Sequence, residues 1–182
     1  MRMCPRCKVE LSKKRYKGVL VDECENCHGI FFDHGELEKV RDAADENLRW
    51  LDFVLFNVSD LQKVQADQGD CPKCGFAMDS LQYAGSSVIL SKCSNCQGVW
   101  LDKGEFQKII AYLEGLVAAM PASELGDAAK RQLVDVFVGP KRESEEIKDL
   151  LAVTRLLEER WIVEHPTIEK IMETYYELTP FK

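Results

Sequence analysis

The sequence predicts an α+β fold in which two small β-hairpin modules are joined and followed by α-helices. Three observations predict it. All eight cysteines occur in Cys-x-x-Cys pairs, the segment around the first two pairs recurs around the last two, and apolar residues keep helical spacing through much of the remaining chain. A chain of 182 residues has room for one ordinary domain or two small ones.

The four cysteine pairs have the spacing of metal-binding knuckles. A Cys-x-x-Cys turn points two thiolates at one metal ion, and two such turns separated by a hairpin complete a tetrahedral site. The first two pairs are separated by 16 residues and the last two by 18, which fits the template for structural zinc. We therefore expect two structural Zn²⁺ ions. The predicted ligands are Cys4, Cys7, Cys24, Cys27, Cys71, Cys74, Cys93 and Cys96.

Three other uses of paired cysteines compete with zinc. Disulfides belong to secreted scaffolds, and the first residues contain no apolar stretch of secretory type. Thioredoxin-like chemistry uses one such pair at a strand–helix junction, whereas this chain has four pairs in hairpin register. Iron remains an alternative, because four thiolates also suit a rubredoxin-like site. Zinc is favoured, and the choice between zinc and iron stays open at this point.

The two halves of the pattern match beyond their cysteines. Cys4-Pro5-Arg6-Cys7 aligns with Cys71-Pro72-Lys73-Cys74, and segment 24–37 aligns with segment 93–106, with two extra residues inside the second hairpin. This register makes each copy a self-contained site, the first pair with the second and the third with the fourth. A cross-braced arrangement, first with third and second with fourth, is the alternative.

Each copy ends on the same apolar signals. Gly29 and Gly98 lie two residues past the last cysteine, where we expect a positive φ as the chain leaves the knuckle. Ile30-Phe31-Phe32 and Val99-Trp100-Leu101 predict short strands that cover the hairpins. Each copy should therefore finish on a buried strand.

A helix start follows each of these strands. Asp33-x-x-Glu36 and Asp102-x-x-Glu105 have the pattern of capping boxes, with Asp at the N-cap and Glu three residues later. In a capping box the Asp side chain accepts from the helix backbone, and the Glu side chain accepts from the backbone N–H of the Asp. Each module should therefore lead directly into a helix.

The combined pattern closely resembles that of bacterial proteins with a transcription factor IIB-type zinc ribbon. The shared motif is Cys-Pro-x-Cys, a hairpin, then Cys-x-x-Cys-x-Gly-(Val/Ile)-aromatic-(Leu/Phe)-Asp-x-Gly-Glu-(Leu/Phe), and it covers residues 3–37 and 70–106. The resemblance implies a three-stranded ribbon with four cysteine ligands in each copy. It implies little about activity, because the bacterial members are mostly functionally undefined. The first copy has Phe31-Phe32 where Trp-Leu is usual, which should change packing and not the metal.

The rest of the chain predicts helices. No Gly or Pro occurs between Glu36 and Gly69, and apolar residues keep helical spacing to Leu61, so one long helix is predicted there, with a candidate restart at Ser59. The segments after the second copy that predict helices are 103–119, 123–138, 143–164 and 167–178. The expected organisation is a first ribbon over 1–35, a helical connector over 36–69, a second ribbon over 70–104 and a helical region over 105–182.

The composition favours a non-enzymatic module that binds another protein, with a regulatory role as one use of it. Closed sites of four cysteines leave no open position for a substrate, and no Ser/His/Asp set or phosphate loop stands out among only three histidines. No apolar run approaches the ~20 residues of a membrane span, so we expect a cytoplasmic protein without a membrane partner. The sequence does not identify the protein partner, and a homo-oligomer is compatible with it.

Nucleic-acid binding, or association with the transcription machinery, is the alternative function. The first hairpin is strongly basic, and phosphate contacts depend on such side chains. The formal net charge of −7 argues against it, because nucleic-acid binders usually carry a basic surplus. The residues that would contact nucleic acid are Lys13, Lys14, Arg15 and Lys17.

Overall fold

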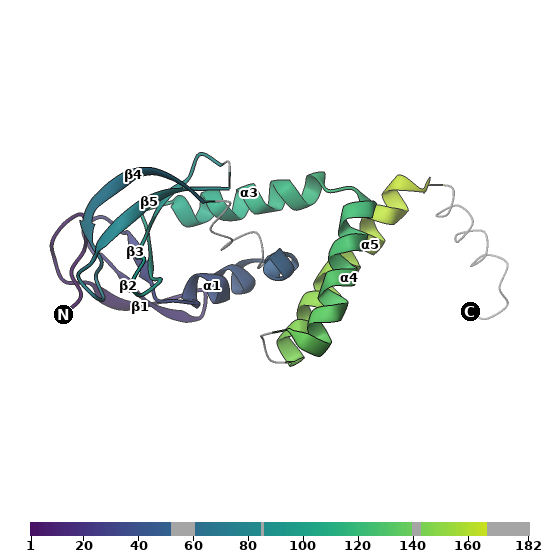
Figure 1. Cartoon of the computed structure of the whole chain (residues 1–182), viewed down its shortest axis with the longest axis horizontal. Coiled ribbons are helices and arrows are strands. Elements are labelled where there is room, and N and C mark those ends of the chain that lie inside the picture. The colour runs from purple at the N-terminus through teal and green to yellow at the C-terminus, as the bar shows by residue number, and fades with distance from the viewer. Residues whose placement is uncertain (52–60, 85, 140–142, 167–182) are drawn as a thin grey trace. The chain divides into compact units, whose positions relative to one another are not determined.

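The computed structural model describes residues 1–51, 61–84, 86–139 and 143–166 (Figure 1). The chain divides into two compact units, Met1–Val117 and Ala118–Lys182. The first unit contains a seven-stranded antiparallel sheet together with helical segments, and the second contains a pair of helices. The α+β class predicted from the sequence is confirmed.

The first cysteine repeat folds into three strands and a helix. Strands β1 (Ser12–Tyr16) and β2 (Val19–Glu23) form a hairpin whose two turn residues, Lys17 and Gly18, both have positive φ. This is the turn geometry that suits the right-handed twist of a two-residue hairpin. Strand β3 (Ile30–Phe32) pairs with β2, and helix α1 (Glu36–Ala44) follows.

The second repeat has the same order. Strands β5 (Ala77–Tyr83), β6 (Ile89–Lys92) and β7 (Val99–Leu101) are antiparallel neighbours, and helix α3 (Glu105–Ala119) follows them. The three-stranded form that the family resemblance implied is therefore present in both copies.

The helical connector predicted over 36–69 was wrong in its last part. Helix α1 ends at Ala44 and a 3₁₀ segment, η1 (Glu46–Leu51), follows it. Residues 61–70 form strand β4 (Leu61–Asp70), which pairs with β5 through two register shifts. Residues 52–60, including the candidate restart at Ser59, lie outside the described residues. Pairing with β5 satisfies the β4 backbone, and this tertiary contact overrides the local helical pattern.

The two repeats join in one sheet. The strand order is β1-β2-β3-β7-β6-β5-β4, so the third strands of the two copies are neighbours at its centre. They run antiparallel, with Phe31 opposite Trp100. Both rings are fully buried, as are the neighbouring Phe32 and Leu101. The short apolar strands therefore pair the two modules with each other, a contact that was not predicted from the sequence.

Three of the four predicted C-terminal helices are confirmed with small shifts in their ends. They are α3, α4 (Ala122–Val138) and α5 (Glu143–Glu164), and segment 167–178 lies outside the described residues. Among the residues that the structure describes, no single helix is long and apolar enough to cross a membrane. Helices α3 and α4 reach that length and hydropathy only when they are taken together across the break before Pro121.

Candidate metal centres

All four cysteine knuckles share one backbone pattern. In the first, the N–H of Lys8 donates to the carbonyl of Cys4 at 3.0 Å, and the N–H of Cys4 donates to the carbonyl of Val9 at 2.8 Å. A further N–H, that of Cys7, points at the Cys4 sulfur at 3.2 Å. The same pair of backbone bonds recurs at Cys24, Cys71 and Cys93. Each knuckle is thus fixed by its own backbone and holds its two sulfurs on one side.

The predicted positive φ at Gly29 and Gly98 was wrong. The left-handed residue of each knuckle is the one four positions after the first cysteine, and those residues are Lys8, His28, Gly75 and Gln97. Gly29 and Gly98 are instead required for space. A Cβ atom at Gly29 would overlap the Trp100 ring, and one at Gly98 would overlap the Phe31 ring.

The first predicted ligand set meets at one point. The sulfurs of Cys4, Cys7, Cys24 and Cys27 all lie within 4.8 Å of one another, and those of Cys4 and Cys27 are 3.7 Å apart. Four sulfurs bound to one Zn²⁺ at ~2.3 Å would be ~3.8 Å apart, so the cluster fits a tetrahedral zinc site. None of the four forms a disulfide.

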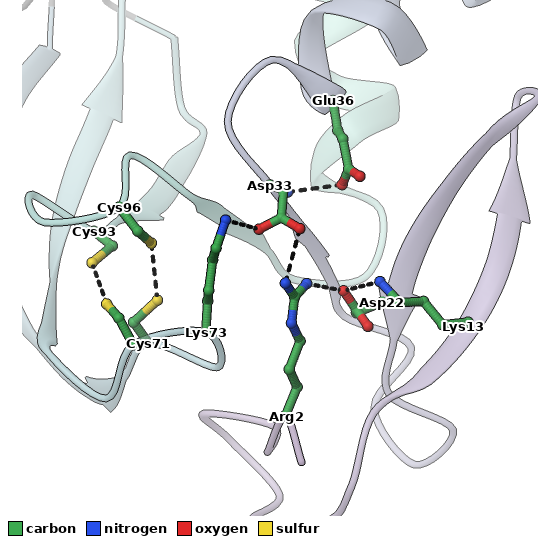
Figure 2. A network of polar contacts seen from close by, with 10 residues as sticks. Arg2, Lys13, Asp22, Asp33, Glu36, Cys71, Lys73, Cys93 and Cys96 are labelled. Carbon is green, nitrogen blue, oxygen red and sulfur yellow. Dashed lines mark hydrogen bonds and ion pairs between the residues drawn. The ribbon is translucent and has the colours of Figure 1, made fainter.

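The second ligand set repeats this arrangement. The sulfurs of Cys71, Cys74, Cys93 and Cys96 lie within 4.8 Å of one another (Figure 2). Cys71 and Cys96 are separated by 3.5 Å, and Cys74 and Cys93 by 3.4 Å, measured between sulfurs. The first pair thus joins the second and the third joins the fourth, and the cross-braced alternative is contradicted.

Without metal, the thiols of each site differ in acidity. Burial raises the pKa of Cys4 to about 12. Burial also acts to raise the pKa of Cys24, but hydrogen bonds from the backbone N–H groups of Cys27 and Asn26 lower it to about 7. In the second site, the N–H of Phe76 and the Asn95 side chain lower the pKa of Cys74 to about 6. Each site thus has one thiol that ionises readily, and metal binding must displace protons from others.

The rings at the centre of the sheet connect the two sites. Phe31 of the first copy lies over Gly98 of the second, and Trp100 of the second lies over Gly29 of the first. Both rings belong to one apolar cluster that also contains buried cysteines of both sites. The contact is reciprocal, because Gly29 and Gly98 are equivalent positions, as are Phe31 and Trp100. The two metal centres therefore share a single core.

Charged residues reinforce the same reciprocal contact. Lys73, in the first knuckle of the second copy, reaches Asp33 at 3.0 Å, and Arg6 at the equivalent position of the first copy reaches Asp102 at 3.2 Å. Arg2 joins Asp33 at 2.9 Å and also pairs with Asp22 (Figure 2). These pairs were not predicted from the sequence, although the recurrence of Arg6/Lys73 and Asp33/Asp102 at matched positions was the available signal.

The predicted capping boxes are half formed. Glu36 accepts from the N–H of Asp33 at 2.8 Å, and Glu105 accepts from the N–H of Asp102 at 2.7 Å. The Asp33 side chain does not cap α1, whose N-cap position is taken by Gly35. Asp33 contacts the other ribbon instead, and Asp102 accepts from the Trp100 indole at 2.8 Å. The two aspartates thus hold the contact between the ribbons.

The candidate nucleic-acid residues lie together on the first hairpin, and part of their charge is used internally. Lys13 pairs with the buried Asp22 at 2.9 Å, and Lys14 pairs with Glu23 at 2.7 Å. Arg15 donates to the carbonyl of Gly18 at 3.4 Å, next to Lys17 in the turn. The positive charge that the hairpin can offer to a phosphate is therefore smaller than its sequence indicates.

Comparison with known proteins agrees with the geometry. The sequence profile of the family described as "Transcription factor zinc-finger", the transcription factor IIB-type zinc ribbon, matches residues 3–43 and 70–112. The match covers both repeats and confirms the resemblance seen in the sequence. No curated protein and no solved structure matches the chain. The family match and the two four-cysteine clusters together identify two structural zinc ions as the cofactors.

Proposed function

Two ribbons of the transcription factor IIB type make up most of the first unit of this chain, and we propose that they form the zinc-stabilised base of a non-enzymatic module that binds another protein. Each site supplies four cysteines to its metal, whereas catalytic zinc keeps a coordination position open for water or substrate. This closed coordination supports a structural role for the metal at both sites.

The exposed apolar side chains of the second unit carry the proposal. Phe137 is 80% exposed and Val138 is 76% exposed near the end of α4, and Leu151 of α5 is 62% exposed. Single exposed apolar residues are common, but a group of large ones on a short helical pair is typical of an interaction surface. A protein partner with an apolar patch of its own is the class that such a surface fits.

Charge also favours a protein over a nucleic acid as partner. The chain carries a formal net charge of −7. In addition, the carboxylates of Asp22 and Glu23 on β2 already pair with two of the four candidate phosphate-binding residues. A nucleic-acid surface would have to overcome this negative field, because phosphate contacts are electrostatic in origin.

A pull-down with the tagged full chain tests the proposal. Native lysate is treated with nuclease or left untreated, and the wild type is compared with two variants. In one, Lys13, Lys14, Arg15 and Lys17 are replaced by Glu, and the other is Phe137→Glu. We expect a stoichiometric protein that survives nuclease, remains with the charge-reversal variant and is lost with Phe137→Glu. Capture that disappears with nuclease and with charge reversal would instead assign the function to the basic hairpin.

A further inference from the structure

The helical pair of the second unit buries little apolar volume between its own helices. The apolar residues buried there are Ala122, Leu125, Ala128 and Val153, and two of these four are alanines. The seam also buries Gln132, Glu146 and Asp149. Larger apolar residues, including Leu133, Phe137, Ile147 and Trp161, are exposed. Two helices of this size rarely form a stable unit unless they bury more apolar surface than this. The outer surface of the pair carries larger apolar side chains than the contact between the two helices, so it could supply that burial.

The outer apolar residues of α5 form one stripe. Ile147, Leu150, Thr154, Leu157 and Trp161 are spaced alternately by three and four positions, which places them on one helix face. The spacing is close to symmetric about Thr154, because Ile147 and Trp161 lie seven positions on either side of it, and Leu150 and Leu157 lie four and three positions away. The Thr154 hydroxyl donates to the carbonyl of Leu150 at 2.7 Å, so its hydrogen-bonding need is met within the helix.

A matching stripe of α4 lies on the same side of the pair. Gly126, Leu133 and Phe137 recur at helical spacing along α4. A Cβ atom at Gly126 would lie 4.0 Å from Cδ1 of Leu157, which joins the two stripes across the pair. We call this surface the apolar hairpin face. Its residues are Gly126, Leu133, Phe137, Ile147, Leu150, Thr154, Leu157 and Trp161.

The two ends of the apolar hairpin face have complementary shapes. At the end where α4 begins and α5 finishes, there is a groove of about 640 Å³. Its lining includes Leu157 and Trp161 of α5 and the small residues Ala122 and Ser123 of α4, with Thr154, Glu158, Glu164 and His165 completing it. At the opposite end, where α4 leads into α5, Phe137 protrudes with 80% of its surface exposed and Ile147 lies on the same face. A groove and a protrusion on one surface are the features that a self-complementary contact requires.

We propose that the apolar hairpin face binds a second copy of this chain in a two-fold symmetric dimer, an inference that rests on the proposed interaction function and names its partner. A two-fold axis near Thr154 places Ile147 of one copy opposite Trp161 of the other, and Leu150 opposite Leu157. The same rotation brings the protruding Phe137 toward the groove of the second copy. The four helices then enclose one apolar core, as in an antiparallel bundle.

Light scattering coupled to size-exclusion chromatography tests this with the zinc-loaded full chain over a range of concentrations. We expect a mass twice that of the 20.8 kDa chain. Phe137→Glu and Trp161→Glu should each shift the protein to the single-chain mass at the same concentration. The matched control is Val163→Glu, because Val163 is 72% exposed and lies on the opposite side of α5 from Trp161. The control should keep the doubled mass.

Three results would overturn the second-copy proposal. A wild type that has the single-chain mass at all concentrations overturns it, as does a dimer that Phe137→Glu and Trp161→Glu leave intact. A single-chain wild type that becomes a dimer when residues 167–182 are deleted shows that the face is covered within the chain. Circular dichroism of each variant confirms that its helices are folded. A monomer that still captures a nuclease-resistant protein partner keeps the proposed function and removes only the second-copy assignment.

Discussion

Gly29 and Gly98 are the residues at which the two ribbons approach each other most closely. Each lies directly beneath an aromatic ring of the other ribbon, so neither position has space for a methyl group. Trp100 cannot easily move aside, because its indole N–H donates to Asp102 at 2.8 Å and the ring is fully buried. The requirement at these glycines is steric, since neither has the positive φ seen at Gly35 or Gly75.

Replacing Gly29 by Ala should destabilise the zinc-loaded protein by about 1–3 kcal/mol, the usual effect of overpacking a core. The midpoint of urea unfolding at fixed zinc concentration measures this. Gly115→Ala is the matched control, because Gly115 lies inside helix α3 with open space around its Cα. That change should stabilise by about 1 kcal/mol through helix propensity. A Gly29→Ala variant as stable as the wild type would contradict the ring contact.

Glu105 makes stability depend on pH. Burial raises the pKa of this carboxyl to about 7, although the hydrogen bond from the Asp102 N–H acts to lower it. Between the ordinary value of 4.5 and about 7, the folded state therefore keeps a proton that the unfolded state has released. A group of this kind lowers the free energy of unfolding as pH rises through that window.

Glu105→Gln removes this titration and keeps an oxygen that can accept from the Asp102 N–H. We expect the variant to gain stability relative to the wild type as pH rises from about 5 to about 7, because only the wild type must ionise a half-buried carboxyl. Urea midpoints of both proteins at each pH test this, and effects of pH on zinc binding cancel in the difference. A constant difference between the two proteins across the range would show that Glu105 does not titrate there.

The pairing of strands β3 and β7 links the two zinc sites. They pair only with β2, β6 and each other, and their rings belong to the cluster that contains cysteines of both sites. Loss of the first metal should loosen β3 in its ribbon and, with it, the Phe31 ring that packs on Gly98. The second site should then lose part of its support without any change in its own ligands.

Cys24→Ser should therefore lower the zinc content from two ions to one and also speed the release of the remaining ion. We expect a chelator to remove that ion at least ~10-fold faster than from the wild type, which corresponds to about 1.4 kcal/mol of lost support. Native mass spectrometry and a colorimetric chelator measure the two quantities. Glu25→Ser, an exposed change in the same knuckle, is the control that should keep both ions. Release at the wild-type rate would show that the sites are independent.

The sequence predicted the elements that local chemistry determines. The cysteine pairing, the third strands and helices α3, α4 and α5 all follow from spacing, apolar runs and Pro or Gly stops. Strand β4 was missed because its segment has no Gly or Pro before Gly69, and only its pairing with β5 makes it a strand. The joined sheet was missed for a related reason. The apolar run Ile30-Phe31-Phe32 is equally compatible with a ribbon that folds alone and with a ribbon that pairs with the second repeat, so the sequence pattern does not distinguish the two.

At the scale of the whole molecule, the two compact units have different sources of stability. The first, Met1–Val117, contains both metal centres, and small ribbons depend on bound zinc for much of their folding energy. The second contains α4 and α5 and no metal ligand among its described residues. Removal of the metal should therefore destabilise the first unit and leave the stability of the second unchanged.

Stripping zinc with a chelator under reducing conditions should accelerate hydrogen exchange throughout the seven-stranded sheet and leave exchange in α4 and α5 unchanged. The reason is that the sheet loses its tetrahedral crosslinks, whereas the helices keep their own contacts. Mass spectrometry of peptides from both units measures this, and restoring zinc should reverse it. Loss of protection in α4 and α5 at the same rate as in the sheet would show that the chain unfolds as one cooperative body.

Because the two similar ribbons belong to one chain, the residues on the two sides of their contact can differ in sequence. Between separate chains the same contact would depend on concentration and would require identical surfaces on both sides. A covalent connection replaces that dependence with an effective concentration that reaches the millimolar range for short linkers. It also permits the two sides to diverge, and Phe31 against Trp100, or Arg6 against Lys73, are such differences. One ribbon can thus acquire new surface features while the other preserves the joint fold.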